Sequence, residues 1–170
     1  MVPAPEAAAV AALPDATGVP VGEVPSLLPP REAVLVRLAE QLPATSGTTA
    51  TLVVLGLMRR DDGRPVAGST VARVTALLAR SLRGEDWLGG SGPAEFVIVM
   101  SGAATGAEIA AQRLVAAVEG LGVPGLSAAA GLAPLTPDLT AGEALRRATV
   151  SLTAARRVGC GTVVQHRLPY

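Results

Sequence analysis

The chain has 170 residues, of which 49% are hydrophobic and 16% are charged, which is enough for one domain with its own core. The formal net charge is zero, all 14 basic residues are Arg, and aromatic residues make up only 2% of the chain. This composition argues against a nucleic-acid-binding surface, which needs clustered positive charge and aromatic stacking platforms.

The N-terminal stretch has no basic leader and is broken by prolines, so we expect no secretory signal. The longest apolar run, residues 50–58, is too short to span a bilayer. The single cysteine, Cys160, excludes an internal disulfide and a cysteine-rich metal site, and we interpret it as a small apolar residue near a strand start. These features predict a cytoplasmic protein.

Residues 1–22 are rich in Pro, Ala and Val and contain few charges. The prolines prevent one stable helix over this stretch, and little in it favours a packed structure. We therefore interpret residues 1–22 as a flexible tail and residues 23–170 as a single domain.

Two stretches after the tail have apolar residues at helical spacing, one from Pro30 onward and one over residues 67–82. The apolar positions are Val34, Leu35, Leu38 and Leu42 in the first stretch, and Val71, Val74, Leu78 and Leu82 in the second. Both predict amphipathic helices. Between them, residues 48–57 form a β-rich and nearly all-apolar run, as expected of a central strand buried on both faces.

The second half of the chain begins with a predicted hairpin, with strands at residues 85–88 and 95–100 joined by the Gly-Gly-Ser-Gly-Pro turn. Thr-Gly-Ala-Glu at residues 105–108 and Thr-Ala-Gly-Glu at residues 140–143 are typical of capping boxes that open helices. A small-residue strand at residues 126–133 separates these helices. Gly159 closes the second helix, and residues 161–166 form a last strand. The order of elements predicts an α/β domain with a mixed sheet.

Five short strings in this order resemble the GGDEF domain of diguanylate cyclases. EVPSLLPPREAVLVRL is similar to the entry segment and first helix of that family, and Leu78, Leu82, Arg83 and Asp86 match its LxxxLRxxD pattern. Five residues after Asp86 stands GPAEF, where the family has GG[DE]EF. AAAGLA is similar to the SIGVA strand, and EALRRATVSLTAARRVGCG resembles the late LLRRADxALYxAKxxGRN helix.

The resemblance covers residues 23–166. It implies a palm-like fold related to nucleotidyl cyclases and polymerases, in which helices flank a central mixed sheet. It also implies a role in bacterial second-messenger signalling.

Joining two GTP molecules requires hard cations held by carboxylates. In the family, these carboxylates come from the first Asp of a DxD at the end of the central strand and from the third signature residue. By the resemblance, these positions are Gly56 and Ala94 here, and neither residue binds a metal. We therefore expect no catalytic residue, no metal and no cofactor.

Other positions of the resembled active site have also changed. They are Met58 at the second DxD aspartate, Gly68 at a guanine-contacting Asp, Gly92 and Pro93 at the two signature glycines, and Arg156 at a late Lys. Pro93 lacks an amide donor, whereas Arg156 retains a cation that could hold phosphate.

Glu95 matches the fourth signature residue, and we interpret it as a solvated turn carboxylate. Phe96 is expected to be a core aromatic. Asp61 and Asp62 would supply metal ligands only if the strand register slipped, but both fall in a turn-like DDGR sequence beyond the strand.

The Arg83-x-x-Asp86 pair is retained. In the family, such a pair forms an inhibitory product site, where Arg donates two hydrogen bonds to guanine and Asp accepts from its N1 and N2 donors. The alternative is a solvated Arg at a helix end with a turn Asp. His166 is expected to be a surface residue, and Trp87 a core or dimer contact rather than a stacking platform.

The sequence thus predicts a catalytically inactive, GGDEF-like regulatory domain that acts as a protein-binding or dimerisation scaffold. One alternative is a cyclic di-GMP receptor that uses Arg83 and Asp86. Another is a GTP-binding module or a residual nucleotidyl cyclase. We expect a protein partner or self-association, cyclic di-GMP or GTP as candidate ligands, and neither nucleic acid nor membrane as a partner.

The tail interpretation gives a first prediction. Removing the residues before Glu23 should change the melting temperature by no more than a few degrees, because this stretch has too little apolar surface to offset its ordering entropy. Thermal melts of the full-length and truncated chains test this. A large fall in melting temperature would mean that the tail packs on the domain.

Overall fold

The computed structural model describes residues 27–59 and 64–167. The predicted tail, Asp61 and Asp62 lie outside this range. In chain order the elements are α1 (Arg31–Gln41), a 3-10 helix η1 (Leu42–Ser46), β1 (Ala50–Arg59), α2 (Gly68–Ser81), β2 (Trp87–Gly92), β3 (Glu95–Ser101), α3 (Ala104–Glu119), β4 (Leu126–Leu135), α4 (Ala141–Val158) and β5 (Val163–Gln165). Apart from η1, this is the predicted order.

The five strands form one sheet in the order β2-β3-β1-β4-β5. β1 pairs antiparallel with both β3 and β4, whereas β5 pairs parallel with β4, which confirms the mixed sheet. β1 lies at the centre, and its first eight residues are buried. A strand with neighbours on both edges and helices on both faces has no solvated side, which explains its continuous apolar run.

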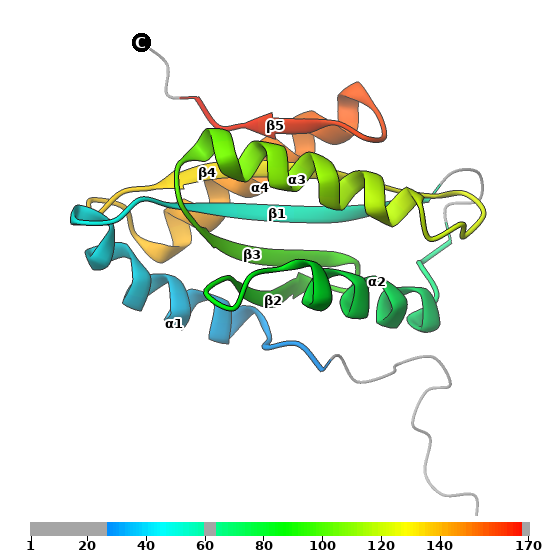
Figure 1. Cartoon of the computed structure of the whole chain (residues 1–170), viewed down its shortest axis with the longest axis horizontal. Helices are drawn as coiled ribbons and strands as arrows, with labels where there is room; N and C mark the ends of the chain where they lie inside the picture. The colour runs from blue at the N-terminus through cyan, green and yellow to red at the C-terminus, as the bar shows by residue number, and fades with distance from the viewer. Residues whose placement is uncertain (1–26, 60–63, 168–170) are drawn as a thin grey trace, which may run out of the picture.

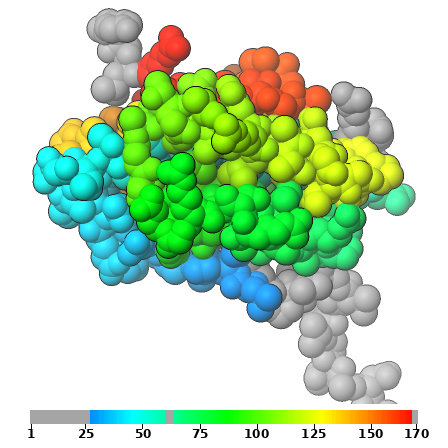
Figure 2. Space-filling model, viewed as in Figure 1, coloured from blue at the N-terminus to red at the C-terminus, as the bar shows by residue number. Residues whose placement is uncertain are grey.

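Helices cover both faces of the sheet. α2 and α3 pack on one face, where they lie side by side in Figures 1 and 2, and α1 and α4 pack on the other. The side chains of β1 alternate between these layers: Val53 and Leu55 belong to the core under α2 and α3, and Leu52 and Val54 to the core under α1 and α4. Successive residues of β1 therefore face opposite sides of the sheet.

α4 approaches the sheet most closely at Gly131 of β4. A Cβ at this position would collide with the backbone of α4, at Leu152 N, at Ala148 O, and at Ser151 C only 2.7 Å away. Glycine is therefore required here because the helix backbone lies directly on the strand, and not because of a left-handed backbone conformation. Helix α4 could not pack at this depth against a larger residue.

The N-terminus of α4 carries the predicted cap. The Thr140 hydroxyl accepts a hydrogen bond of 3.2 Å from the Glu143 backbone N–H. The Glu143 carboxylate does not complete the box, because it accepts hydrogen bonds from Arg146 and Arg147 instead. These bonds lower the pKa of Glu143 from 4.5 to about 2. Because that pKa is depressed, the stabilisation is present above pH 4.5 and is lost as the pH falls toward about 2.

Two sequence-based expectations were wrong. The hairpin strand begins at Trp87 and runs through the glycines to Gly92, because a bulge between Gly90 and Gly92 lets that stretch remain paired with β3. α3 begins at Ala104 after an Ala103 cap with no side-chain bond, so Thr105 lies inside the first turn. Cys160 lies shortly before β5, near a strand start as expected, and is exposed in the turn after α4.

Two features of the ends of the domain are also defined. Before α1, the Pro29 carbonyl accepts a hydrogen bond of 2.9 Å from Gly90 N–H, so this segment lies along the edge strand β2. After α4, Gly159 ends the helix with a φ of 141°, as predicted.

Across residues 27–59 and 64–167, no helix is long and apolar enough to cross a membrane.

The packing at Gly131 gives a prediction about stability. Gly131→Ala should lower the free energy of unfolding by about 1 to 3 kcal/mol, because the added methyl group forces α4 away from the sheet. Chemical denaturation with a two-state fit measures this change.

The matched control is Gly142→Ala in the first turn of the same helix, where a Cβ would meet no atom within 4 Å. Alanine is the better helix former, so this change should be neutral or stabilising. Equal destabilisation by the two substitutions would contradict the close approach at Gly131.

Candidate functional site

The first candidate site surrounds Gly56, at the far end of the buried part of β1. Gly56 pairs with Glu95 of β3, so the two residues are direct neighbours across the strands and face the same side of the sheet. Above them lies the last part of α4, which contributes Leu152 and Arg156. We call Gly56, Ser91, Glu95 and Arg156 together the Gly56 site.

The space beside Gly56 is filled by an arginine. A Cβ at this position would collide with Arg156 Nη2, would lie 2.8 Å from Arg156 Cζ, and would lie 3.0 Å from Leu152 Cδ2. The guanidinium therefore occupies the volume into which any side chain at position 56 would project. Gly56 has no side chain that could bind a metal ion, and the positively charged Arg156 guanidinium lies in the space beside it.

Glu95 binds this arginine. Its Oε1 accepts a hydrogen bond of 3.0 Å from Arg156 Nη1, and its Oε2 accepts one of 3.3 Å from the Ser91 hydroxyl. The Glu95 and Arg156 side chains are 26% and 34% exposed. The interpretation of Glu95 as a solvated turn carboxylate was wrong, because it is the first residue of β3 and its carboxylate has a cationic partner on α4.

The remaining positions of the resembled active site do not assemble into a metal site. The Ala94 side chain packs against the core under α2 and α3, whereas the Gly56 position faces α4. Met58 packs on the α1 and α4 core, and Gly68 is the first residue of α2. Gly92 ends β2, and Pro93 stands in the turn before β3.

The residues of the Gly56 site do not fit a divalent metal ion. In the described ranges 27–59 and 64–167, no three His, Cys, Asp or Glu side chains gather in one place to hold a metal. At the Gly56 site, the Glu95 carboxylate is already compensated by Arg156. Hard cations need several oxygen ligands, and this site offers one carboxylate that is already paired.

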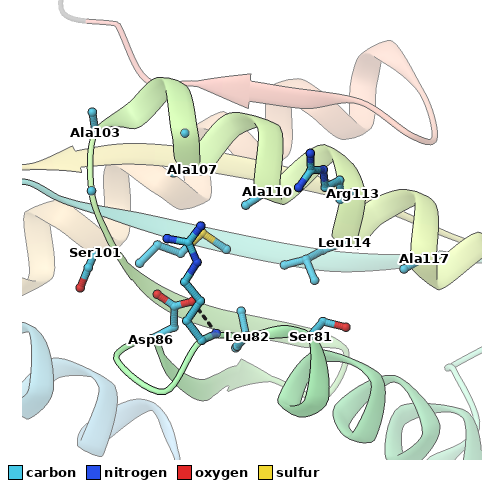
Figure 3. Close-up of a pocket in the computed structure, with 14 residues that line it drawn as sticks. Ser81, Leu82, Asp86, Ser101, Ala103, Ala107, Ala110, Arg113, Leu114 and Ala117 are labelled. Atoms are coloured by element: carbon cyan, nitrogen blue, oxygen red, sulfur yellow. Dashed lines mark hydrogen bonds between the residues drawn. The ribbon is translucent and has the colours of Figure 1, made fainter.

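The second candidate site is a pocket of about 460 Å³ between the end of α2 and α3, which we call the α2–α3 pocket. Figure 3 shows it between Asp86 on one side and Ala110, Arg113 and Leu114 of α3 on the other. Many of its lining residues are small, and they leave the hollow open: Gly102, Ala103, Gly106, Ala107, Ala110 and Ala117.

Arg83 and Asp86 both line the α2–α3 pocket, so the structure brings the predicted pair to a concave surface. The Asp86 Oδ2 atom accepts a hydrogen bond of 2.9 Å from the Arg83 backbone N–H, and the Asp86 N–H donates one of 3.1 Å to the Arg83 carbonyl. These two bonds close the turn and fix the direction of the carboxylate. The Arg83 guanidinium has no ion-pair partner in the part of the chain that the structure describes.

Arg113 is a third charged residue of the pocket, and sequence reasoning missed it. It is exposed on α3, where it lies next to Leu114 and one turn after Ala110 on the wall opposite Asp86 (Figure 3). No ion pair holds its guanidinium among residues 27–59 and 64–167. In a chain whose basic residues are all Arg, only the packing of α3 against the end of α2 distinguishes it from the others.

The other singled-out residues lie outside both sites. Phe96 is 1% exposed in the core under α2 and α3, as expected. Trp87 is half-buried and packs on the α1 and α4 core, which confirms a core contact. His166 follows β5, where it is half-buried and its backbone N–H donates to Leu132 O.

Comparison with solved structures identifies the fold. The GGDEF domain of DgcB from Caulobacter crescentus, solved with cyclic di-GMP, matches with a TM-score of 0.70 and 19% identity over 82% of this chain and 91% of that one. The active GGEEF domain of a diguanylate cyclase from Vibrio cholerae matches with a TM-score of 0.70 and 16% identity over 84% and 99% of the two chains.

A third match is the diguanylate cyclase SiaD from Pseudomonas aeruginosa, solved with its activator SiaC. Its TM-score is 0.71 at 22% identity, over 81% of this chain and 58% of that one. These matches show that the chain has the fold of a GGDEF domain, with the palm-like mixed sheet that the resemblance implied. No protein-family model matches the chain, and no curated protein matches its sequence.

Proposed function

We propose that this chain is a non-catalytic regulatory domain of GGDEF fold that binds cyclic di-GMP in the α2–α3 pocket. The observation that carries the proposal is the presence of Arg83, Asp86 and Arg113 around one pocket, in a fold whose Gly56 site holds an arginine instead of metal-binding carboxylates. The protein would then read a nucleotide signal without making it.

The loss of catalysis is supported by the Gly56 site. Condensation of two GTP molecules needs cations to bind the triphosphates and to activate a 3′-hydroxyl. Gly56 and Ala94 provide no ligand, and the Glu95 carboxylate is engaged by Arg156. The GTP-binding and residual-cyclase alternatives also lose support, because Pro93 has no N–H to offer to a phosphate.

Ligand binding is supported by the chemistry of the α2–α3 pocket. An arginine donates two parallel hydrogen bonds to O6 and N7 of guanine, and a carboxylate accepts from the N1 and N2 donors on the adjacent edge. Asp86 keeps its Oδ1 atom available, because the turn hydrogen bond uses Oδ2. Arg113 adds a second cation on the opposite wall, where the anionic ring of a cyclic dinucleotide would lie.

The volume of the pocket and the fixed turn at its edge also favour a ligand of this kind. Its volume of about 460 Å³ lies in the range of small-molecule sites, which is about 300 to 1,000 Å³. The turn that holds Arg83 and Asp86 is closed by two hydrogen bonds before any ligand arrives, and such preorganisation lowers the entropic cost of binding. Structures of similar fold, including that of DgcB, were solved with cyclic di-GMP.

A protein-binding scaffold is the second candidate. α4 exposes two large apolar side chains, Val150 at 49% and Val158 at its C-terminal end at 74%. SiaD, which has a similar fold, was solved with its activator protein SiaC. A scaffold needs no ligand in the α2–α3 pocket, so ligand titration separates the two candidates.

The proposed lack of catalysis gives one prediction. Incubation of the protein with GTP and either Mg²⁺ or Mn²⁺ should yield no cyclic di-GMP above a no-protein control, because two cations cannot be held beside Arg156. Product formation is followed by chromatography. Turnover that disappears in Glu95→Ala would overturn the non-catalytic assignment.

The proposed ligand site gives another prediction. Calorimetric titration with cyclic di-GMP should show binding that weakens by roughly tenfold to more than a hundredfold in Arg83→Ala, since a bidentate guanine contact contributes about 1 to 3 kcal/mol. Asp86→Ala and Arg113→Ala should weaken it as well. The melting temperatures of the variants separate a binding defect from a folding defect.

Arg80→Ala is the matched control. Arg80 is exposed on the same helix, α2, but does not line the pocket, so the variant changes the net charge equally and should bind normally. No binding to the wild type at high micromolar ligand would favour the scaffold. Binding that all three pocket substitutions leave unchanged would place the ligand elsewhere.

A further inference from the structure

We infer that Arg156 is a resident cation that replaces divalent metal ions at the Gly56 site, so that this site excludes metal ions by volume and by charge. The inference concerns the non-catalytic half of the proposed function. It rests on the three-way fit of Gly56, Glu95 and Arg156, and not on the α2–α3 pocket.

The first support is the match between the glycine and the guanidinium. β1 pairs on both edges at Gly56, so the extended backbone there accepts any residue. The three atoms nearest to a Cβ built there are Arg156 Nη2, Arg156 Cζ and Leu152 Cδ2. All three are side-chain atoms, so a larger residue at position 56 would have to displace the guanidinium from its place beside Glu95.

The second support is charge. Glu95 faces the same side of the sheet as Gly56, and it would be a half-buried carboxylate without a cation if Arg156 were absent. The hydrogen bond of 3.0 Å from Arg156 Nη1 supplies that positive charge from within the chain. A divalent ion at Glu95 would have to displace the guanidinium or approach it, and like charges at contact distance repel strongly in a partly desolvated site.

The third support is that the arginine is held in place. Ser91 donates to the other oxygen of Glu95, so the carboxylate is fixed from β2 while Arg156 reaches it from α4. The ion pair thus joins the β2–β3 hairpin to the helix on the α1 and α4 side of the sheet. The Arg156 side chain thus links these elements through Glu95 without a metal ion.

A substitution cycle tests the fit between Gly56 and Arg156. Gly56→Ala should lower the melting temperature by about 2 to 4 °C, because the new methyl group pushes the guanidinium away from Glu95. In an Arg156→Ala background the same substitution should have a clearly smaller effect, since only Leu152 Cδ2 of the three crowding atoms remains. Equal effects in both backgrounds would overturn the inference.

Metal exclusion is tested with Mn²⁺ alone, measured by the electron paramagnetic resonance of the free ion. Gly56→Asp places a second carboxylate beside Glu95, and the double variant Gly56→Asp with Arg156→Ala also removes the cation. The double variant should bind Mn²⁺ about tenfold more tightly than Gly56→Asp, or better, and the wild type should bind least.

Two outcomes of the Mn²⁺ titration would overturn the inference. One is binding to Gly56→Asp as tight as binding to the double variant. The other is no gain in the double variant while its melting curve shows an intact fold. If the double variant does not fold, the inference is tested by the melting temperatures of Gly56→Ala in the wild-type and Arg156→Ala backgrounds. Failure here is distinct from failure of ligand binding, because Mn²⁺ reads the Gly56 site and cyclic di-GMP titration reads the α2–α3 pocket.

Discussion

The direct contact between α4 and the sheet sets the geometry of the Gly56 site. Gly131 of β4 lets the helix backbone lie against the strand, and Leu152 contributes both to this contact and to the crowding at Gly56. Gly131 pairs with Val54, two residues before Gly56 on β1. One helical turn after Leu152, α4 therefore carries Arg156 over the end of β1, where the guanidinium lies against Gly56.

The contact also explains why the changes at the resembled active site form a consistent set. Without a side chain at position 56, a long cationic side chain from α4 can reach Glu95, and the carboxylate is neutralised inside the fold. Loss of a metal ligand alone would leave Glu95 without a partner. The Gly56 site thus has the character of a rebuilt structural contact, and its residues support each other across β1, β3 and α4.

Local patterns in the sequence predicted the elements well and their partners poorly. The helical and strand periods of β1, α1 and α2 reflect burial on defined faces, which a single sequence contains. Glu95 was misjudged because its partner is 61 residues away. Arg113 was not identified because nothing local distinguishes it from the other arginines. The hairpin was misplaced because glycines usually mark turns, whereas here a bulge keeps Gly90 and Gly92 in the strand.

The two candidate sites lie at opposite ends and on opposite faces of β3. Glu95 begins the strand on the side of α1 and α4, whereas Met100 and Ser101 end it at the α2–α3 pocket. The sites share no lining residue, and the core of β1 and β3 separates them. Substitutions at the Gly56 site therefore leave the pocket walls unchanged. Arg83 and Asp86 therefore line a pocket whose walls are independent of the residues at the Gly56 site.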